Sequence, residues 1–272
     1  MTAPAVLTLV KNREPHLHQL VEGLRRSTTV PAELIVVDMS DDPVTLPPLP
    51  FPARVIRHAG RGLPLAAARN LAAAATAAEH LVFLDVDCIP LDGCLARLVE
   101  TLAAEDALLC ADVRYLGPDD ARGPWTQTDL LAAGAPHPAR DFPAAGHRRE
   151  HDPGLFWSLA FAVRARRFRA LGGFDEAFTG YGGEDTDLGL RAAAAGVPLL
   201  FVGGAIACHQ WHESEDPPVR HLADIVRNAR LFHAKHGWWP MHGWLRAFRD
   251  RGLVRWTDDS LVLVDDDPVH PS

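Results

Sequence analysis

Two aspartates stand directly after one of the most apolar segments of the chain. Leu81–Leu84 reads LVFL and is followed by Asp85-Val86-Asp87. Carboxylate oxygens are the ligands that hard divalent cations such as Mn²⁺ and Mg²⁺ prefer, and such a cation can bridge the oxygens of a diphosphate. Asp-x-Asp is common in solvated loops, where it only caps a strand. Here it follows a buried strand at the point where the chain turns, and this position favours a cation site.

A second acidic segment, Gly182-Gly183-Glu184-Asp185, combines flexible backbone with paired carboxylates. Glycine lets the backbone approach a ligand closely. The two acids fall where a helix is expected to begin. Because the helix dipole favours carboxylates there, an ordinary acidic helix start is one interpretation. The other is catalytic, because a positioned carboxylate can take the proton from a hydroxyl group.

Two histidines, His209 and His212, lie three residues apart and can share one side of a turn. Imidazole is the commonest metal ligand among ionisable side chains. The chain holds 14 histidines, so chance pairs are also expected. The sequence does not choose between a structural pair and a metal site, nor between the two histidines as the ligand.

Apolar runs alternate with helical patterns in the first half of the chain. Expected strands are Ala5–Val10, Glu33–Asp38, Arg54–His58, His80–Asp85 and Ala107–Val113, and expected helices are His16–Ser27, Leu63–Ala78 and Leu91–Ala104. This alternation predicts an α/β fold with a mostly parallel sheet flanked by helices. Ligands of such sheets bind at the carboxyl ends of the strands, where Asp38, Asp85 and Asp87 fall.

The second half of the chain is less regular. Arg114–Pro153 is rich in Pro, Gly, Ala and His, which predicts a long, partly ordered loop, and long loops in compact domains are often functional. After it we expect a helix at Glu184–Ala195, short strands at Leu199–Val202 and Ala205–His209, and helices at Val219–Lys235 and Met241–Arg251. No repeat or linker interrupts the pattern. We therefore expect one continuous unit over residues 1–215 and a C-terminal helical extension, residues 216–272, packed on it.

Composition excludes some classes of protein. The formal net charge is -8, which argues against nucleic-acid binding through charge alone. No apolar stretch is long enough to span a membrane, and the first residues lack a secretory pattern, so a cytoplasmic protein is expected. The four cysteines form no CxxC pair, which favours buried thiols in a reducing compartment.

The predicted C-terminal extension is basic, although the chain is acidic. Val219–Arg251 holds seven Lys and Arg residues against two Asp, together with several tryptophans. Such a surface is typical of peripheral membrane contact with a lipid-linked acceptor. The preferred interpretation is simpler: the helices pack on the domain, their arginines are solvated and their aromatic side chains lie in the core.

These motifs belong to a larger set, in a fixed order along residues 5–215. The set comprises Val6–Arg13 (VLTLVKNR), Leu34–Asp41 (LIVVDMSD), Ala67–Leu71 (AARNL), Leu81–Asp87 (LVFLDVD), Leu171–Phe178 (LGGFDEAF) and Tyr181–Arg191 (YGGEDTDLGLR), then His209 and His212. As an ensemble it resembles the family 2 glycosyltransferases of GT-A fold, especially their galactosyltransferase-like branch. The resemblance implies an enzyme that moves a sugar, with inversion, from a nucleoside diphosphate sugar to an acceptor hydroxyl.

The resemblance also implies a role for each site residue. It assigns the nucleotide to Leu9, Lys11, Asn12, Arg13, Asp38, Arg69, Asp85 and Val86; Mn²⁺ or Mg²⁺ to Asp87 with His209 or His212; and the acceptor to Trp157, Gly182, Gly183 and Glu184. Asp185 would be the general base, and Glu184 would share that role or hold the acceptor. Asp38 would accept a hydrogen bond from N3 of uracil. Met39 departs from the family, which often has a second acid there, and GDP or dTDP would need only small changes around Asp38.

Two other functions compete with this interpretation. A sugar-phosphate nucleotidyltransferase should carry a glycine-rich loop after its first strand, but Lys11–Pro15 (KNREP) contains no glycine. A non-catalytic nucleotide-sugar-binding protein would not need Asp85, Asp87, Asp185 and the histidine pair together. The identity of the acceptor (a carbohydrate, a lipid-linked sugar or a small molecule) and the oligomeric state do not follow from the sequence.

Overall fold

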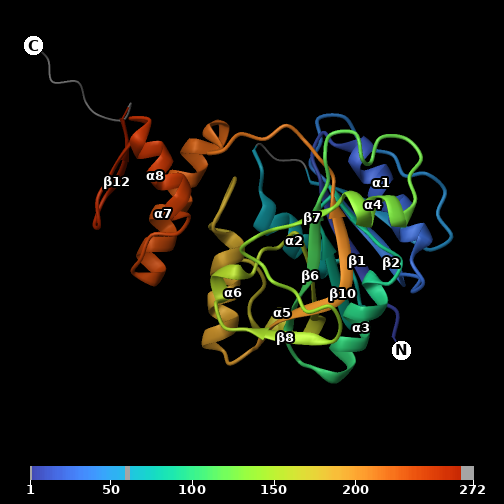
Figure 1. Ribbon diagram of the computed structural model, residues 1–272. Coiled ribbons are helices and arrows are strands. Elements are labelled where there is room, and N and C mark those ends of the chain that lie inside the picture. Colours follow the sequence, from blue (N-terminus) through green and yellow to red (C-terminus); the bar gives the residue numbers. More distant parts are fainter. Residues whose placement is uncertain (1, 59–61, 265–272) are drawn as a thin grey trace, which may run out of the picture.

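The computed structural model describes residues 2–58 and 62–264 (Figure 1). Its main sheet has the strand order β3-β2-β1-β4-β9-β6-β10-β5. These strands are β1 (Ala5–Val10), β2 (Glu33–Asp38), β3 (Ala53–Arg57), β4 (His80–Leu84), β5 (Cys88–Pro90), β6 (Leu108–Tyr115), β9 (Ala160–Arg164) and β10 (Leu199–His209). The pairs β1–β2, β2–β3, β1–β4 and β6–β10 are parallel, while β9 lies antiparallel between β4 and β6. The predicted α/β fold with a mostly parallel sheet is confirmed.

Helices cover both faces of the sheet because its strands are apolar on both sides. The helices of the α/β part are α1 (Glu14–Arg26), α2 (Leu65–Ala74), α3 (Cys94–Ala104), α5 (Ala165–Ala170) and α6 (Glu184–Ala194). On β1, Val6 and Val10 pack into the core shared with α1 and α3. Leu7 and Leu9, one residue out of phase, pack into the core shared with α2, α5 and α6. Because successive side chains point to opposite faces, β1 contributes to both cores.

A third core forms the C-terminal part of the described chain, seen at the left of Figure 1. It contains η2 (Val219–His221), α7 (Leu222–His236), α8 (His242–Asp250) and the hairpin β11 (Val254–Trp256) and β12 (Leu261–Leu263). The hairpin was not predicted; its strands have three residues each, and buried Leu261 packs beneath α7 and α8. We call residues 219–264 the C-terminal module. The domain boundary at residue 215 stays a prediction.

The structure specifies one prediction about the second half and overturns another. The order expected in part of Arg114–Pro153 consists of α4 (Gln127–Ala133), β7 (Ala135–Pro136) and β8 (His147–Glu150). Helix α4 begins with a reciprocal capping box, in which the side chains of Thr126 and Asp129 each accept a hydrogen bond from the other residue's backbone N–H. Composition alone does not reveal this helix start. The two short strands expected at 199–209 are one strand, β10, whose register shifts between Val202 and Ile206 at a glycine bulge.

Candidate active site

The carboxyl ends of β1, β2 and β4 lie side by side and bring the predicted nucleotide-site residues together. Asp38 is fully buried and accepts hydrogen bonds from Ser40 N (2.9 Å), Val44 N (3.0 Å) and Arg57 Nη1 (2.6 Å). Burial alone would raise the pKa of Asp38, but these hydrogen bonds hold it below its ordinary value. The carboxylate already has three partners within the protein, so its contact with a base stays a prediction.

The segment after β1 turns sharply and sends its side chains to different places. Leu9 is buried in β1, whereas Lys11 Nζ donates to Gly62 O at 2.7 Å. Asn12 has a positive φ of 54°, and its side-chain nitrogen donates to Asp41 Oδ2 at 2.8 Å. Arg13 turns toward the end of β4, where it meets the second aspartate of the Asp-x-Asp motif.

That aspartate, Asp87, is the centre of a compact cluster. Its Oδ2 lies 2.6 Å from Arg13 Nη1 and 3.5 Å from His212 Nε2, and its Oδ1 lies 3.5 Å from His209 Nε2. One ligand atom from Asp87, His209 and His212 each can be chosen so that all lie within 4.8 Å of one another. The sequence predicted these three residues as metal ligands, and the structure brings both histidines to the aspartate.

The donor set of this cluster fits a divalent cation. Asp87 is 5% exposed, and within residues 2–58 and 62–264 its buried Oδ1 has no hydrogen-bond partner. An unpaired buried carboxylate oxygen is costly unless a ligand completes it. His212 Nδ1 lies 3.2 Å from Glu213 O, so a proton there leaves the Nε2 lone pair free. Burial, then the charge of Arg13, lowers the pKa of His212, which favours the neutral imidazole that binds metals.

A buried arginine joins the two acidic motifs. Arg69 of α2, 4% exposed, donates to Asp85 Oδ1 at 3.1 Å and to Glu184 Oε1 at 3.0 Å. Glu184 is itself buried at the start of α6. The end of β4 and the start of α6 are therefore held at a fixed separation. Arg69 was predicted to contact the nucleotide and Glu184 the acceptor, and the structure shows that these two residues also pair with each other.

Asp185 follows Glu184 and lines a cavity of about 500 Å³. Its Oδ1 accepts from Thr186 N at 2.7 Å. Burial, then the neighbouring charge of Glu184, raises its pKa from 3.8 to about 7. Burial likewise raises the pKa of Asp85, which lines the same cavity, to about 6. A carboxylate poised near neutral pH in a cleft suits proton transfer.

The glycines before Asp185 are required by their surroundings. Gly182 and Gly183 have φ values of 93° and 94°, and both line the cavity. A Cβ on Gly182 would lie 2.8 Å from Met241 Sδ. The positive φ at both positions favours glycine, and Met241 of the C-terminal module lies against Gly182.

Aromatic side chains that sequence reasoning missed complete the cavity. Besides the predicted Trp157, its lining includes Tyr115, His137, Tyr181, His242 and Trp244. One signal was available: the chain has only two tyrosines, and both are here. Val86 is buried beneath the Asp-x-Asp turn and packs into the core.

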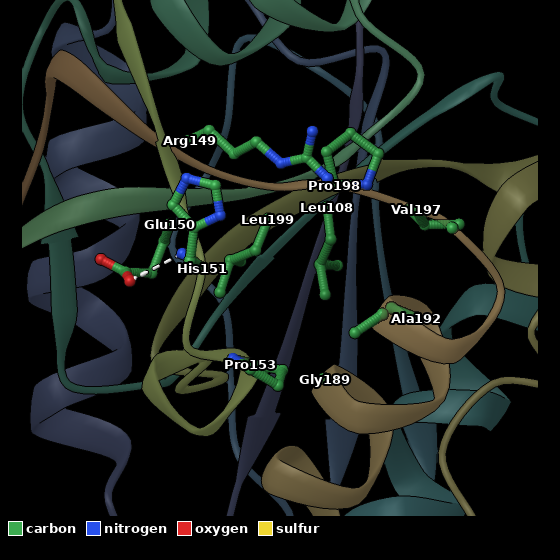
Figure 2. Close-up of a pocket in the computed structure, with 12 residues that line it drawn as sticks. Leu108, Arg149, Glu150, His151, Pro153, Gly189, Ala192, Val197, Pro198 and Leu199 are labelled. Atoms are coloured by element: carbon green, nitrogen blue, oxygen red, sulfur yellow. Dashed lines mark hydrogen bonds between the residues drawn. The ribbon is translucent and has the colours of Figure 1, made fainter.

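A second, smaller cavity of about 100 Å³ lies elsewhere (Figure 2). Its lining includes Leu108 and Leu199, the first residues of β6 and β10, together with Arg149, Glu150 and His151. This is the amino-terminal edge of the parallel strands, opposite the edge where such sheets bind ligands. Its volume is also too small for a nucleotide sugar, so the large cavity is the candidate active site.

Solved structures share this arrangement of sheet and helices. GalNAc-T7, solved with UDP, GalNAc and Mn²⁺, aligns with a TM-score of 0.61 and 19% identity over 89% of this chain and 49% of that chain. The mannosyltransferase PcManGT from Pyrobaculum calidifontis, solved with GDP-Man and Mn²⁺, aligns with a TM-score of 0.57 and 17% identity over 92% of this chain and 65% of that chain. The fold is that of the GT-A glycosyltransferases.

Sequence comparison identifies the family. The model of glycosyl transferase family 2 matches residues 5–171, and the model of the N-terminal domain of galactosyltransferase matches residues 148–211. Validoxylamine A glucosyltransferase of Streptomyces hygroscopicus subsp. limoneus is 30% identical over 256 residues, covering 83% of this chain and 55% of the relative. The chain thus spans about half the length of this curated relative. It belongs to glycosyl transferase family 2, as the motif ensemble implied.

Proposed function

We propose that this protein transfers a sugar from a UDP-sugar to an acceptor hydroxyl, with inversion and with the help of a divalent cation. The observation that carries the proposal is the Asp87 carboxylate. Among the described residues its buried Oδ1 has no hydrogen-bond partner, and His209 and His212 lie beside its two oxygens. The end of β4 links this cluster to the cavity that holds Asp185. Relatives solved with nucleotides or nucleotide sugars and Mn²⁺ support the assignment.

Asp87, His209 and His212 would hold the cation. Two imidazoles and one carboxylate suit Mn²⁺ better than Mg²⁺, which prefers oxygen ligands and retains its waters. When bound, the cation supplies positive charge that stabilises the diphosphate leaving group. Arg13, 2.6 Å from Asp87, adds a fixed positive charge beside the same group.

The protein's own residues would carry out the proton transfer. Ionised Asp185 accepts the proton of the acceptor hydroxyl while that oxygen bonds to the anomeric carbon. The bond from the anomeric carbon to the diphosphate oxygen breaks, and UDP leaves with the electron pair. Glu184, held by Arg69 at 3.0 Å, keeps Asp185 less acidic and thereby a stronger base.

The first test is thermal stabilisation by UDP, GDP and dTDP, each with Mn²⁺, with Mg²⁺ and with a chelator. A ligand of the native state raises the melting temperature by mass action. We expect a rise with UDP and Mn²⁺ that the chelator abolishes. A protein that no nucleotide stabilises would overturn the proposal and favour a non-catalytic protein of the same fold.

The cellular compartment of the reaction and the kind of acceptor are also proposals. Within the described residues, no helix is long and apolar enough to cross a membrane. The four cysteines are free and buried, which fits a reducing compartment such as the cytoplasm. A carbohydrate, lipid-linked or small-molecule acceptor would each fit a glycosyltransferase. If the basic C-terminal helices contact a membrane peripherally, the protein should sediment with anionic liposomes.

A further inference from the structure

The large cavity is acidic where it would receive the acceptor. Of the described residues that line it, three are carboxylates, Asp85, Glu184 and Asp185, and one is a guanidinium, Arg69. Arg69 is already paired with Asp85 and Glu184. Burial, then Arg140, lowers the pKa of lining His137 below 6.5, so this imidazole adds no charge at neutral pH. The lining therefore carries excess negative charge, which attracts cations and repels phosphates.

Positive charge for the donor would come instead from the cluster around Asp87, whose residues do not line the cavity. Arg13 and the cation held by Asp87 and the two histidines would meet the diphosphate of the donor. Buried Arg140 stands near the cavity, with its guanidinium carbon 5.1 Å from the Trp157 ring centre, but it is 4% exposed and does not line the cavity. The site thus separates a cationic donor side from an anionic acceptor side.

The same cavity is lined by two groups of aromatic rings. In the first, the His137 ring centre lies 4.7 Å from that of Trp157 and 5.9 Å from that of Tyr115. In the second, the ring centres of Tyr181 and Trp244 lie 5.8 Å apart. Flat apolar faces bind the C–H surface of a ring compound, and the faces of Trp and Tyr also attract an ammonium group.

The second aromatic group depends on the C-terminal module. Trp244 belongs to α8, and Tyr181 stacks on His221 of η2 at 4.6 Å. Asp187 of α6, fully buried, contacts Lys235 Nζ at 2.6 Å and His236 Nε2 at 2.9 Å, both from α7. These contacts fix the module against α6, the helix whose first turn holds Glu184 and Asp185. The module is thus part of the acceptor site.

Building on the proposed glycosyltransferase function, we propose that the acceptor is a polyhydroxylated ring that carries a protonated amine. Its ring packs between the aromatic side chains, and its ammonium group lies among the tryptophan and tyrosine faces near the Asp85 and Asp185 carboxylates. An ammonium group brings three hydrogen-bond donors, which suits a site rich in carboxylate acceptors. A phosphorylated acceptor would meet repulsion from the same carboxylates.

The test uses rings that share a skeleton and differ in charge. Binding of glucosamine, N-acetylglucosamine, glucose and glucose 6-phosphate is measured by calorimetry at neutral pH, with the free protein and with UDP and Mn²⁺ present. We expect glucosamine to bind about tenfold more tightly than the two uncharged rings, and the phosphate to bind most weakly. Equal binding of all four, tightest binding of the phosphate, or no binding of any ring would overturn the proposal.

Two tryptophan variants locate the effect. Trp244→Leu should remove most of the preference for glucosamine over glucose. Trp238→Leu is the matched control, because Trp238 belongs to the same module, is 42% exposed and does not line the cavity. If both variants keep the preference, Trp244 does not form the amine site and the proposal fails.

The melting temperature with UDP and Mn²⁺, measured on the same samples, reports the donor site separately. A normal rise together with no charge preference would leave the glycosyltransferase function standing and overturn only the amine acceptor. No rise would overturn the proposed function itself, while ring binding to the free protein would still decide whether the cavity prefers an amine.

Discussion

Asp185→Asn tests the general base, because the substitution keeps the shape of the side chain and removes its charge. A positioned base contributes about 10²–10⁴-fold to the rate, so kcat should fall by about that factor. The native enzyme should also lose activity in acid. With a pKa of about 7, Asp185 is about 9% ionised at about pH 6 and about 91% ionised at about pH 8, so kcat should rise about tenfold over this interval.

The assay is UDP release at saturating donor, acceptor and Mn²⁺, over the same pH range for both proteins. Protonation of the cation cluster could also reduce activity in acid. The melting-temperature rise with UDP and Mn²⁺, measured at each pH, reports that contribution alone. If Asp185→Asn keeps native activity, or keeps the acidic limb while UDP still binds, Asp185 is not the base.

The same pKa shift predicts an effect of this substitution on stability. Because burial raises the pKa of Asp185 from 3.8 to about 7, ionisation is less favourable in the folded than in the unfolded protein. The contribution of Asp185 to the free energy of unfolding is therefore fully present below about pH 4. It is lost between about pH 4 and about pH 7, and the loss amounts to about 4 kcal/mol. Asp185→Asn should therefore be more stable than the native protein at about pH 8 and about equal to it at about pH 4. Urea unfolding at both pH values measures this, and a less stable variant at the higher pH would contradict the buried-carboxylate argument.

Three further predictions concern other parts of the site. Asp87→Asn should abolish the Mn²⁺-dependent rise of the melting temperature with UDP. The control Asp119→Asn changes a highly exposed aspartate and should keep that rise. If both variants show the same rise, Asp87 is not part of the cation site. Arg69→Met leaves the buried carboxylate of Glu184 and the partly buried carboxylate of Asp85 without their cation, and should lower the free energy of unfolding by about 3–5 kcal/mol in urea. A loss below about 1 kcal/mol would show that solvent reaches both carboxylates. Asp187→Asn weakens the contacts of α6 with α7 and should raise KM for the acceptor while leaving UDP binding unchanged, and an unchanged KM would show that the C-terminal module is held by packing alone.

Parts of this site could be predicted from local sequence, for a physical reason. Asp85 and Asp87 follow an apolar run, and in a parallel sheet the ends of such strands meet at one edge. His209 ends β10, whose antiparallel pairing with β5 sets it opposite Cys88, next to Asp87 in the chain. Short motifs at strand ends therefore predicted that Asp87 and the two histidines lie together, because sheet geometry brings strand ends together; their binding of a metal stays a prediction.

Other parts could not be predicted because they depend on contacts between distant segments. Arg69 pairs with Glu184, 115 residues further along the chain, and no local pattern marks that partner. The cavity's aromatic rings come from separate segments, so Tyr115 and Trp244 share no periodicity that would associate them. The glycine bulge in β10 resembled a turn between two strands because glycine permits either structure.

The charge distribution connects the two proposals. The donor brings a diphosphate, and the cation cluster with Arg13 supplies the positive charge that it needs. Asp185 must instead be basic enough to take a proton, and negative neighbours with little solvent raise its pKa. The acidity that favours proton transfer also selects the acceptor, because an ammonium group offsets the negative charge and a phosphate adds to it. An amine beside Asp185 would lower its pKa again, so such an acceptor should keep the base ionised at lower pH than a neutral acceptor does.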